Sequence, residues 1–262
     1  MAVRVGIGGW TFAPWRGPFY PDGLAQKREL EFASRAVTSI EINGTFYGTQ
    51  KRDSFVRWYQ ETPEGFVFAL KGPRFTTNRR VLAEAGESVE RFLASGVLEL
   101  KEKLGPINWQ MAATKAFDAA DFEAFLALLP PERDGHALRH VVEVRHASFA
   151  CPEFIALLRR YGVAAVVADH ASHPLLPDVT APFVYARLQA ASEDEPAGYS
   201  TEALALWERR AKAWAKGQVP KDLPAIAGRA AAAKSRDVFI YMINGFKPKA
   251  PAAAMALIER LA

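Results

Sequence analysis

Ionisable side chains end a series of short apolar runs in this chain. Three carboxylates, Glu41, Glu143 and Asp169, lie at or near these ends. A carboxyl group with a raised pKa can act as a general acid or base, so these three are the candidate catalytic residues. Other runs end in or close to a cation, and these cations are Lys71, Arg145 and Arg187. Such cations bind a substrate anion or stabilise negative charge that develops in a reaction.

Amide and aromatic side chains accompany the charged groups. Asn43 ends the run that contains Glu41, and Gln110 and Asn244 end two further runs; each of the three could hydrogen-bond a ligand. Trp10 ends the first run and Tyr47 lies just beyond the second, where their rings could stack on a sugar or a base. The alternatives are packing within the loops for the two rings, and pairing with one another for the charged groups. Taken together, the set predicts a polar ligand site.

Histidines raise the question of a metal or a proton carrier. His170 and His173 follow the sixth run, and with Glu41 or Glu143 they would form a nitrogen and carboxylate ligand set. No further motif fixes their geometry, so we expect no metal and no cofactor. His146 could act as a general acid or base, a role for which imidazole is a common choice, although a solvated loop position is the favoured interpretation.

The apolar runs predict the strands of a parallel sheet. There are eight, at 3–10, 39–43, 66–71, 107–110, 141–145, 165–169, 183–187 and 239–244. Helical stripes lie between them, and strands alternating with helices form βαβ units whose sheet is covered on both faces. Eight strands in 262 residues favour an α/β fold, a TIM-barrel-like (β/α)8 single domain over residues 1–262. An open doubly wound sheet is the alternative. In such barrels the site lies at the carboxyl ends of the strands.

Helix signals and irregular stretches complete this pattern. Pro152 begins a helix that Gly162 ends, and Ser200 caps another. The apolar stripe at 89–104 predicts a helix that stops at a glycine. A long loop over one end of the barrel is expected at 11–27. The alanine-rich stretch 218–237 predicts a peripheral helix or excursion.

The composition is that of an ordinary globular protein, with 50% hydrophobic and 24% charged residues. A net charge of +4 is only mildly basic and does not by itself indicate nucleic-acid binding. The single cysteine, Cys151, excludes an intrachain disulfide. The N-terminus starts in a strand pattern without a secretory or membrane-spanning apolar run. We therefore expect a cytoplasmic protein with no membrane partner.

Several motifs resemble one known family. Its most specific string is Glu41-Ile-Asn43-Gly-Thr45-Phe46-Tyr47. The other matching pieces are 8–10, 15–21, Trp58, 68–71, Gln110, Glu143-Val-Arg145, Asp169, 185–187, Tyr199 and Asn244. On these pieces the chain resembles the YecE-like family, domain of unknown function 72, over nearly its whole length. The resemblance implies a TIM-barrel-like fold with a pocket at the strand ends and no settled activity. It also adds Tyr199 to the candidate ligand-binding residues.

The chain departs from this family pattern at two histidines. Thr77-Asn78 stands where many members have Thr-His, and Arg187-Leu-Gln189-Ala stands where many have Arg-x-His-Gly. The architecture also resembles sugar isomerases and apurinic endonucleases, but their set of metal ligands has no counterpart here. A mechanism that needs these histidines to carry protons is therefore in doubt, and a carboxylate would have to replace them.

Three functions are compatible with this sequence. We favour an acid–base enzyme, a hydrolase or isomerase acting on a small polar or anionic ligand such as a carbohydrate or phosphorylated compound. If basic partners neutralise all three carboxylates, no general acid remains and this hypothesis fails. A nucleic-acid-binding or processing protein is less favoured, and it would use the basic loop residues Arg74, Arg79, Arg80, Lys247 and Lys249. A non-catalytic ligand-binding barrel is the third alternative, which the missing histidines support.

Overall fold

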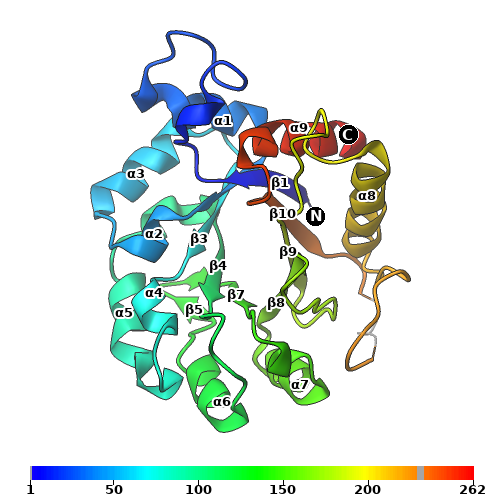
Figure 1. The fold of residues 1–262 in the computed structure, drawn as a ribbon. Coiled ribbons are helices and arrows are strands. Elements are labelled where there is room, and N and C mark those ends of the chain that lie inside the picture. The colour runs from blue at the N-terminus through cyan, green and yellow to red at the C-terminus, as the bar shows by residue number, and fades with distance from the viewer. Residues whose placement is uncertain (1, 229–232) are drawn as a thin grey trace.

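A closed barrel of eight parallel strands dominates the computed structural model, which describes residues 2–228 and 233–262 (Figure 1). The strands are β1 Val3–Gly8, β2 Ser39–Ile42, β3 Val67–Lys71, β4 Leu104–Gln110, β7 His140–Glu143, β8 Ala164–Asp169, β9 Phe183–Leu188 and β10 Asp237–Met242. They follow one another around the barrel in chain order, and β10 pairs with β1 to close it. The predicted TIM-barrel-like fold is confirmed. Two further short strands, β5 (Glu132–Arg133) and β6 (His136–Ala137), form a small antiparallel hairpin outside the barrel.

Helices surround the barrel in Figure 1. They are α1 Glu29–Ala36, α2 Gly44–Tyr47, α3 Arg52–Glu61, α4 Arg74–Thr77, α5 Gly86–Leu93, α6 Ala119–Ala127, α7 Pro152–Tyr161, α8 Thr201–Ala215 and α9 Ala250–Leu261. The single turns α2 and α4 directly follow β2 and β3, so they lie at the carboxyl ends of the strands. Within the described ranges, none of the helices is both long and apolar enough to cross a bilayer.

Strand alternation decides which side chains face the barrel axis. Small and aromatic residues such as Val166, Tyr185 and Tyr241 form a buried cluster of their own, apart from the larger core under the helices. Side chains two residues further along a strand point the same way. The axis-facing Tyr185 is therefore followed by an axis-facing Arg187, and this alternation carries polar groups to one end of the barrel.

Three predicted helix boundaries are confirmed. Pro152 is the first residue of α7, and Gly162 ends that helix in the left-handed region at φ 65°. The hydroxyl of Ser200 accepts a hydrogen bond from the Ala203 amide at 3.2 Å and caps α8.

The single long helix expected at 89–104 is wrong. Helix α5 ends at Leu93, and a 3₁₀ segment, Val97–Lys103, follows after Gly96, which adopts φ 108°. A Cβ at Gly96 would lie 2.8 Å from the Cα of Arg52 on α3, so close packing against that helix requires glycine at this break. Leu104 already belongs to β4.

The two irregular stretches differ in how far they are described. Segment 11–27 contains only a short 3₁₀ turn, Ala13–Trp15, before a second turn starts at its end, and it is the expected long loop. Segment 218–237 includes 229–232, which lie outside the described residues. In its described parts the chain forms no helix, and β10 begins at Asp237.

Candidate functional site

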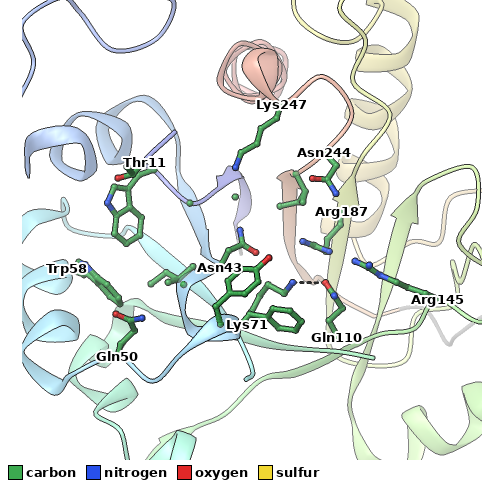
Figure 2. A pocket seen from close by; sticks show the side chains of 18 residues that line it. Thr11, Asn43, Gln50, Trp58, Lys71, Gln110, Arg145, Arg187, Asn244 and Lys247 are labelled. Atoms are coloured by element: carbon green, nitrogen blue, oxygen red, sulfur yellow. Dashed lines mark hydrogen bonds between the residues drawn. The ribbon is translucent and has the colours of Figure 1, made fainter. Parts of the chain in front are cut away.

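A cavity of about 580 Å³ opens at the carboxyl ends of the strands (Figure 2). This volume suits a small molecule. Eight of the predicted site residues line it: Trp10, Asn43, Tyr47, Lys71, Gln110, Arg145, Arg187 and Asn244. The other lining residues are Gly8, Gly9, Thr11, Ile42, Gly44, Phe46, Gln50, Trp58, Ile243 and Lys247. The strand ends and the loops that follow them thus build one common pocket.

The described lining is cationic. Lys71, Arg145, Arg187 and Lys247 contribute four positive side chains, and the described lining residues include no carboxylate. In Figure 2, Arg145 and Arg187 lie on the opposite side of the cavity from Trp58, and Lys247 approaches from the last loop. A pocket of this kind attracts anions.

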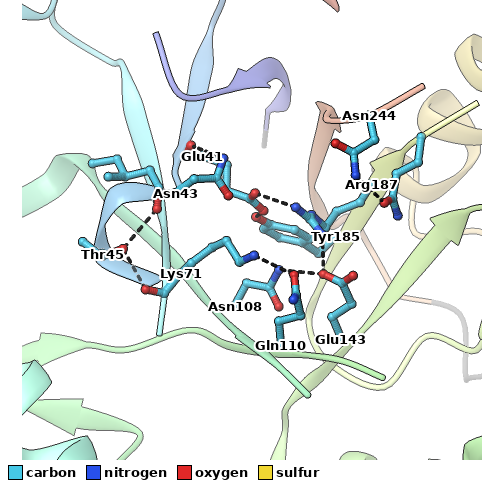
Figure 3. A network of polar contacts seen from close by, with 12 residues as sticks. Glu41, Asn43, Thr45, Lys71, Asn108, Gln110, Glu143, Tyr185, Arg187 and Asn244 are labelled. Atoms are coloured by element: carbon cyan, nitrogen blue, oxygen red, sulfur yellow. Dashed lines mark hydrogen bonds and ion pairs between the residues drawn. The ribbon is translucent and has the colours of Figure 1, made fainter. Parts of the chain in front are cut away.

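The missing carboxylates lie beneath the pocket, around Arg187 (Figure 3). Nη2 of Arg187 is 2.9 Å from Oε1 of Glu41, and Nη1 pairs with Oε2 of Glu143. Both glutamates and the arginine are at most 2% exposed. Tyr185 donates a hydrogen bond to Glu41 at 2.6 Å, and Arg145 reaches Glu143 at 2.9 Å. Pairing of the charged residues with one another was the alternative to a catalytic role, and these four side chains are paired in this way.

These pairs keep Glu143 ionised. Burial alone raises the pKa of its carboxyl group, but the positive charges of Arg187, Arg145 and Lys71 outweigh that effect and lower the pKa to about 2. Burial opposes the charge of Arg187 as well, yet Glu143 and Glu41 raise its pKa. The geometry therefore suits the two glutamates to holding Arg187 in place. Neither glutamate is among the described lining residues of the cavity, where a proton donor would have to meet a ligand.

Asp169 and Tyr199 lie outside the described lining of the cavity, which corrects their expected position. The axis-facing residues of β8 are Ala164, Val166 and Ala168, so Asp169 points the other way. Tyr199 donates a hydrogen bond to Asp169 at 3.3 Å. Burial raises the pKa of Asp169.

Lys71 is the most unusual charge in the pocket. Its side chain is only 5% exposed, and Nζ donates to Oε1 of Gln110 at 2.6 Å. Nζ also lies 4.0 Å from the ring centre of Phe46. Burial, together with the positive charges of Arg187 and Arg145, lowers the pKa of Lys71 to about 8, although Glu41 and Glu143 oppose the shift. The amine is therefore partly neutral near physiological pH.

Aromatic rings form the opposite wall of the cavity. The rings of Trp10 and Trp58 pack edge to face at 5.3 Å. Tyr47 is 69% exposed, with the guanidinium of Arg74 5.9 Å from its ring centre. Its exposed face is available for stacking at the mouth of the pocket.

Loop 11–27 holds two parts of the pocket in place. The hydroxyl of Tyr20 donates a hydrogen bond to the carbonyl of Trp10. The indole nitrogen of Trp15 donates to the carbonyl of Lys247 at 3.0 Å, and Trp15 itself is fully buried. This loop therefore connects the first and last strands above the barrel.

Several pocket residues were missed as ligand contacts by the sequence analysis. Thr11, Gln50, Trp58 and Lys247 all line the cavity, although none ends a strand. Trp58 was noted only as a family match, and Lys247 only as a basic loop residue. Asn108, whose amide lies 3.3 Å from Glu143, could have been found by alternation, because it precedes Gln110 by two positions on β4.

The histidine and carboxylate ligand set does not assemble. His170 and His173 stack on each other with ring centres 3.8 Å apart, while Glu41 and Glu143 are occupied by Arg187. Among the residues that the structure describes, no three His, Cys, Asp or Glu side chains are grouped to hold a metal ion. His146 is half-buried, and its Nδ1 lies 2.8 Å from the hydroxyl of Ser148.

Comparison with known proteins gives matches along most of the chain. The model of the family described as "Protein of unknown function DUF72" matches residues 4–262. The UPF0759 proteins YecE of Escherichia coli strain K12 and of Escherichia coli O157:H7 are each 29% identical to this chain over 189 residues. That match covers 66% of this chain and spans 62% of the length of these relatives.

Two solved structures share the fold. A DUF72 family protein from Thermotoga maritima MSB8 has a TM-score of 0.77 at 22% identity, covering 100% of this chain and 99% of the other. One from Enterococcus faecalis V583 has a TM-score of 0.69 at 17% identity, covering 99% and 98%. Identities this low establish the barrel alone. Because the family model extends over nearly the whole sequence, this chain belongs to the DUF72 family of proteins of unknown function.

Proposed function

We propose that this protein is an enzyme that acts on a small polar anion, a phosphorylated or carboxylated compound of carbohydrate size, in the strand-end cavity. The observation that carries the proposal is the cationic lining, with Lys71, Arg145, Arg187 and Lys247 facing one cavity and the nearest carboxylates buried below it. The two buried glutamates and these four cations leave a net charge of +2 when Lys71 is protonated.

The cations divide into two roles. Both terminal nitrogens of Arg187 pair with Glu41 and Glu143. Arg187 therefore contributes its positive charge to the pocket and does not bind a ligand through both nitrogens. Arg145 uses Nε and Nη2 on Glu143 and is 24% exposed, which leaves Nη1 to meet an anion. Lys247 lies 4.5 Å from the ring centre of Phe12 and faces the same space. Arginine and lysine together suit a phosphate or carboxylate group.

Lys71 is the group that we propose exchanges a proton with the ligand. The predicted carboxylate acids are either paired with Arg187 or, as Asp169, outside the described lining. An amine with a pKa of about 8 is suited to proton transfer near neutral pH. Asn43, Gln50, Gln110 and Asn244 supply amides that could orient hydroxyl groups.

Calorimetric titration tests the anion site. Glucose 6-phosphate is expected to bind at least about tenfold more tightly than glucose, since a charge-assisted hydrogen bond contributes about 1.5–3 kcal/mol. Arg145→Gln should weaken this binding by about tenfold or more. Arg133→Gln is the matched control, because Arg133 pairs with Glu90 on the outer surface. Equal affinity for glucose and its phosphate would contradict the anion site.

Turnover separates an enzyme from a non-catalytic barrel. Phosphorylated sugars incubated with the protein are followed by ³¹P and ¹H NMR spectroscopy, with Lys71→Met as the inactive control. Product formation that this variant abolishes supports the proposal. Tight binding without any product across the panel favours the non-catalytic alternative.

A further inference from the structure

We propose that Lys71 is a covalent nucleophile that forms a Schiff base with an aldehyde or ketone bearing a phosphate or carboxylate group. This inference rests on the proposed function, because it uses the same cavity and the same anion-binding cations. It goes further by naming the reactive group of the ligand, a carbonyl carbon, and the bond that forms.

The hydrogen bonding of Lys71 distinguishes it from the other buried lysine. Lys103 donates to the carbonyls of Tyr59 and Thr62 at 2.7 Å each and lies 3.2 Å from the Thr62 hydroxyl. Three acceptors require three N–H donors, which only the ammonium form provides. Lys71 donates to Gln110 alone and forms no ion pair within the described part of the chain. A neutral Lys71 amine therefore keeps its hydrogen bond and has its lone pair free.

The surroundings of Lys71 favour that neutral form. Its Nζ is buried at the floor of the cavity near two guanidinium groups, Arg187 and Arg145. Desolvation and a neighbouring cation are the two ways in which proteins activate a lysine as a nucleophile. The ring of Phe46 and the Gln110 oxygen stabilise the ammonium form, so they partly oppose this activation.

The placement of the other cations defines the ligand. Arg145 and Lys247 line the same cavity as Lys71, as Figure 2 shows, and neither bonds to it. An anionic group held by either of these side chains would leave the rest of a short ligand inside the cavity that Lys71 lines. Carbonyl compounds of about three to six carbons with a phosphate or carboxylate match a cavity of about 580 Å³.

The step balances without a redox partner. The neutral amine of Lys71 adds to the carbonyl carbon, and the C=O π bond becomes a hydroxyl on a carbinolamine. This hydroxyl leaves as water, and a protonated C=N bond forms. Starting from the ammonium, two hydrogens leave the nitrogen with the carbonyl oxygen, and the positive charge stays on nitrogen.

Reductive trapping tests the inference on the full chain. The protein is incubated with glyceraldehyde 3-phosphate or pyruvate, reduced with sodium borohydride, digested and mapped by mass spectrometry. We expect Lys71 to gain the mass of the carbonyl compound less one oxygen, at least about tenfold faster than the exposed Lys216 in the same digest. Uncharged glyceraldehyde should label Lys71 no faster than Lys216. Arg145→Gln should slow the labelling of Lys71, and Arg133→Gln should not.

The outcomes separate this inference from the proposed function. Labelling of Lys71 that rises with pH through about 8 supports the Schiff base. Calorimetric binding of glyceraldehyde 3-phosphate without trapping by either probe at Lys71 overturns the Schiff base and leaves the anion site standing. Equal labelling of Lys71 and Lys216 also overturns it. Absence of both binding and trapping overturns the proposed function as well.

Discussion

The surroundings of Lys71 conflict with its own charge. Burial removes water from its ammonium group, and two guanidinium groups repel it, while no ion pair in the described structure compensates. Residues that oppose stability in this way are characteristic of functional sites, because a side chain selected only for folding would be replaced by an apolar one. The conflict therefore argues for a chemical role at this position.

Replacing Lys71 with methionine should stabilise the protein at neutral pH. The pKa of Lys71 is about 8 in the folded protein, against an ordinary value of 10.5, so its charge costs stability fully below pH 8. The cost shrinks as the pH rises from 8 and vanishes above 10.5. We expect Lys71→Met to raise the free energy of unfolding by about 1–3 kcal/mol at pH 7 and by less at pH 10. Urea denaturation at both pH values measures the difference.

Lysine 103 provides the control for that measurement. Its side chain is as little exposed as that of Lys71, and burial lowers its pKa as well, but its ammonium group donates to three oxygen atoms, so Lys103→Met should destabilise the protein. A Lys71→Met variant less stable than the parent protein at pH 7 would contradict the account of Lys71.

The residue pairs of the site could be predicted only in part from the sequence. Glu143 and Arg145 lie two positions apart, so alternation correctly places them together. Asp169 ends a strand whose residues are almost uniformly apolar, and such a strand has no polar alternation to show which face meets the axis. The packing of Val166 and Ala168 inside the barrel decides it, and that is a property of the closed sheet.

Elements were predictable where a local signal sets them. All eight strands and the ends of α7 follow from apolar runs, proline and glycine. The break at Gly96 follows from its contact with α3. The apolar stripe at 89–104 could not predict it, because the stripe contains no information about packing between helices. The length of loop 11–27 could also be predicted from the sequence. Its hydrogen bonds to Trp10 and Lys247 could not, because they depend on the barrel beneath the loop.

The loop should influence ligand binding through Tyr20. Tyr20→Phe removes the donor to the Trp10 carbonyl and leaves that oxygen without its partner. We expect a loss of about 1–3 kcal/mol in the free energy of unfolding. Because Trp10 lines the cavity, we also expect a roughly fivefold weaker affinity for glucose 6-phosphate, equivalent to about 1 kcal/mol.

Tyr59→Phe is the matched substitution for this loop prediction. The Tyr59 hydroxyl bonds to Glu102 at 2.9 Å, away from the cavity. Calorimetry should therefore find unchanged glucose 6-phosphate affinity in this control. Unchanged affinity in Tyr20→Phe as well would show that the loop does not shape the site.

At the scale of the whole molecule, four cations line one cavity at the strand ends, while the net charge of the chain is only +4. This favours a small anion over a long polyanion. Among the loop cations considered for nucleic acid, Arg79 donates to the carbonyls of Phe75 and Glu84, and Lys249 to those of Glu193 and Glu195. Those donors are already engaged, whereas Arg145 and Lys247 face the cavity.

Salt dependence distinguishes the two kinds of partner. A protein that neutralises Z phosphates of a single strand shows a slope of about −0.7Z in log K against log salt, because condensed counterions are released. We expect a ten-nucleotide single strand, followed by fluorescence anisotropy from 50 to 200 mM NaCl, to bind more weakly than glucose 6-phosphate throughout. Arg80→Gln should leave glucose 6-phosphate affinity unchanged, whereas Arg145→Gln weakens it. Tighter binding of the strand, with a steep slope that Arg80→Gln reduces, would instead identify a nucleic acid as the partner, because only a polyanion reaching the outer loops engages Arg80.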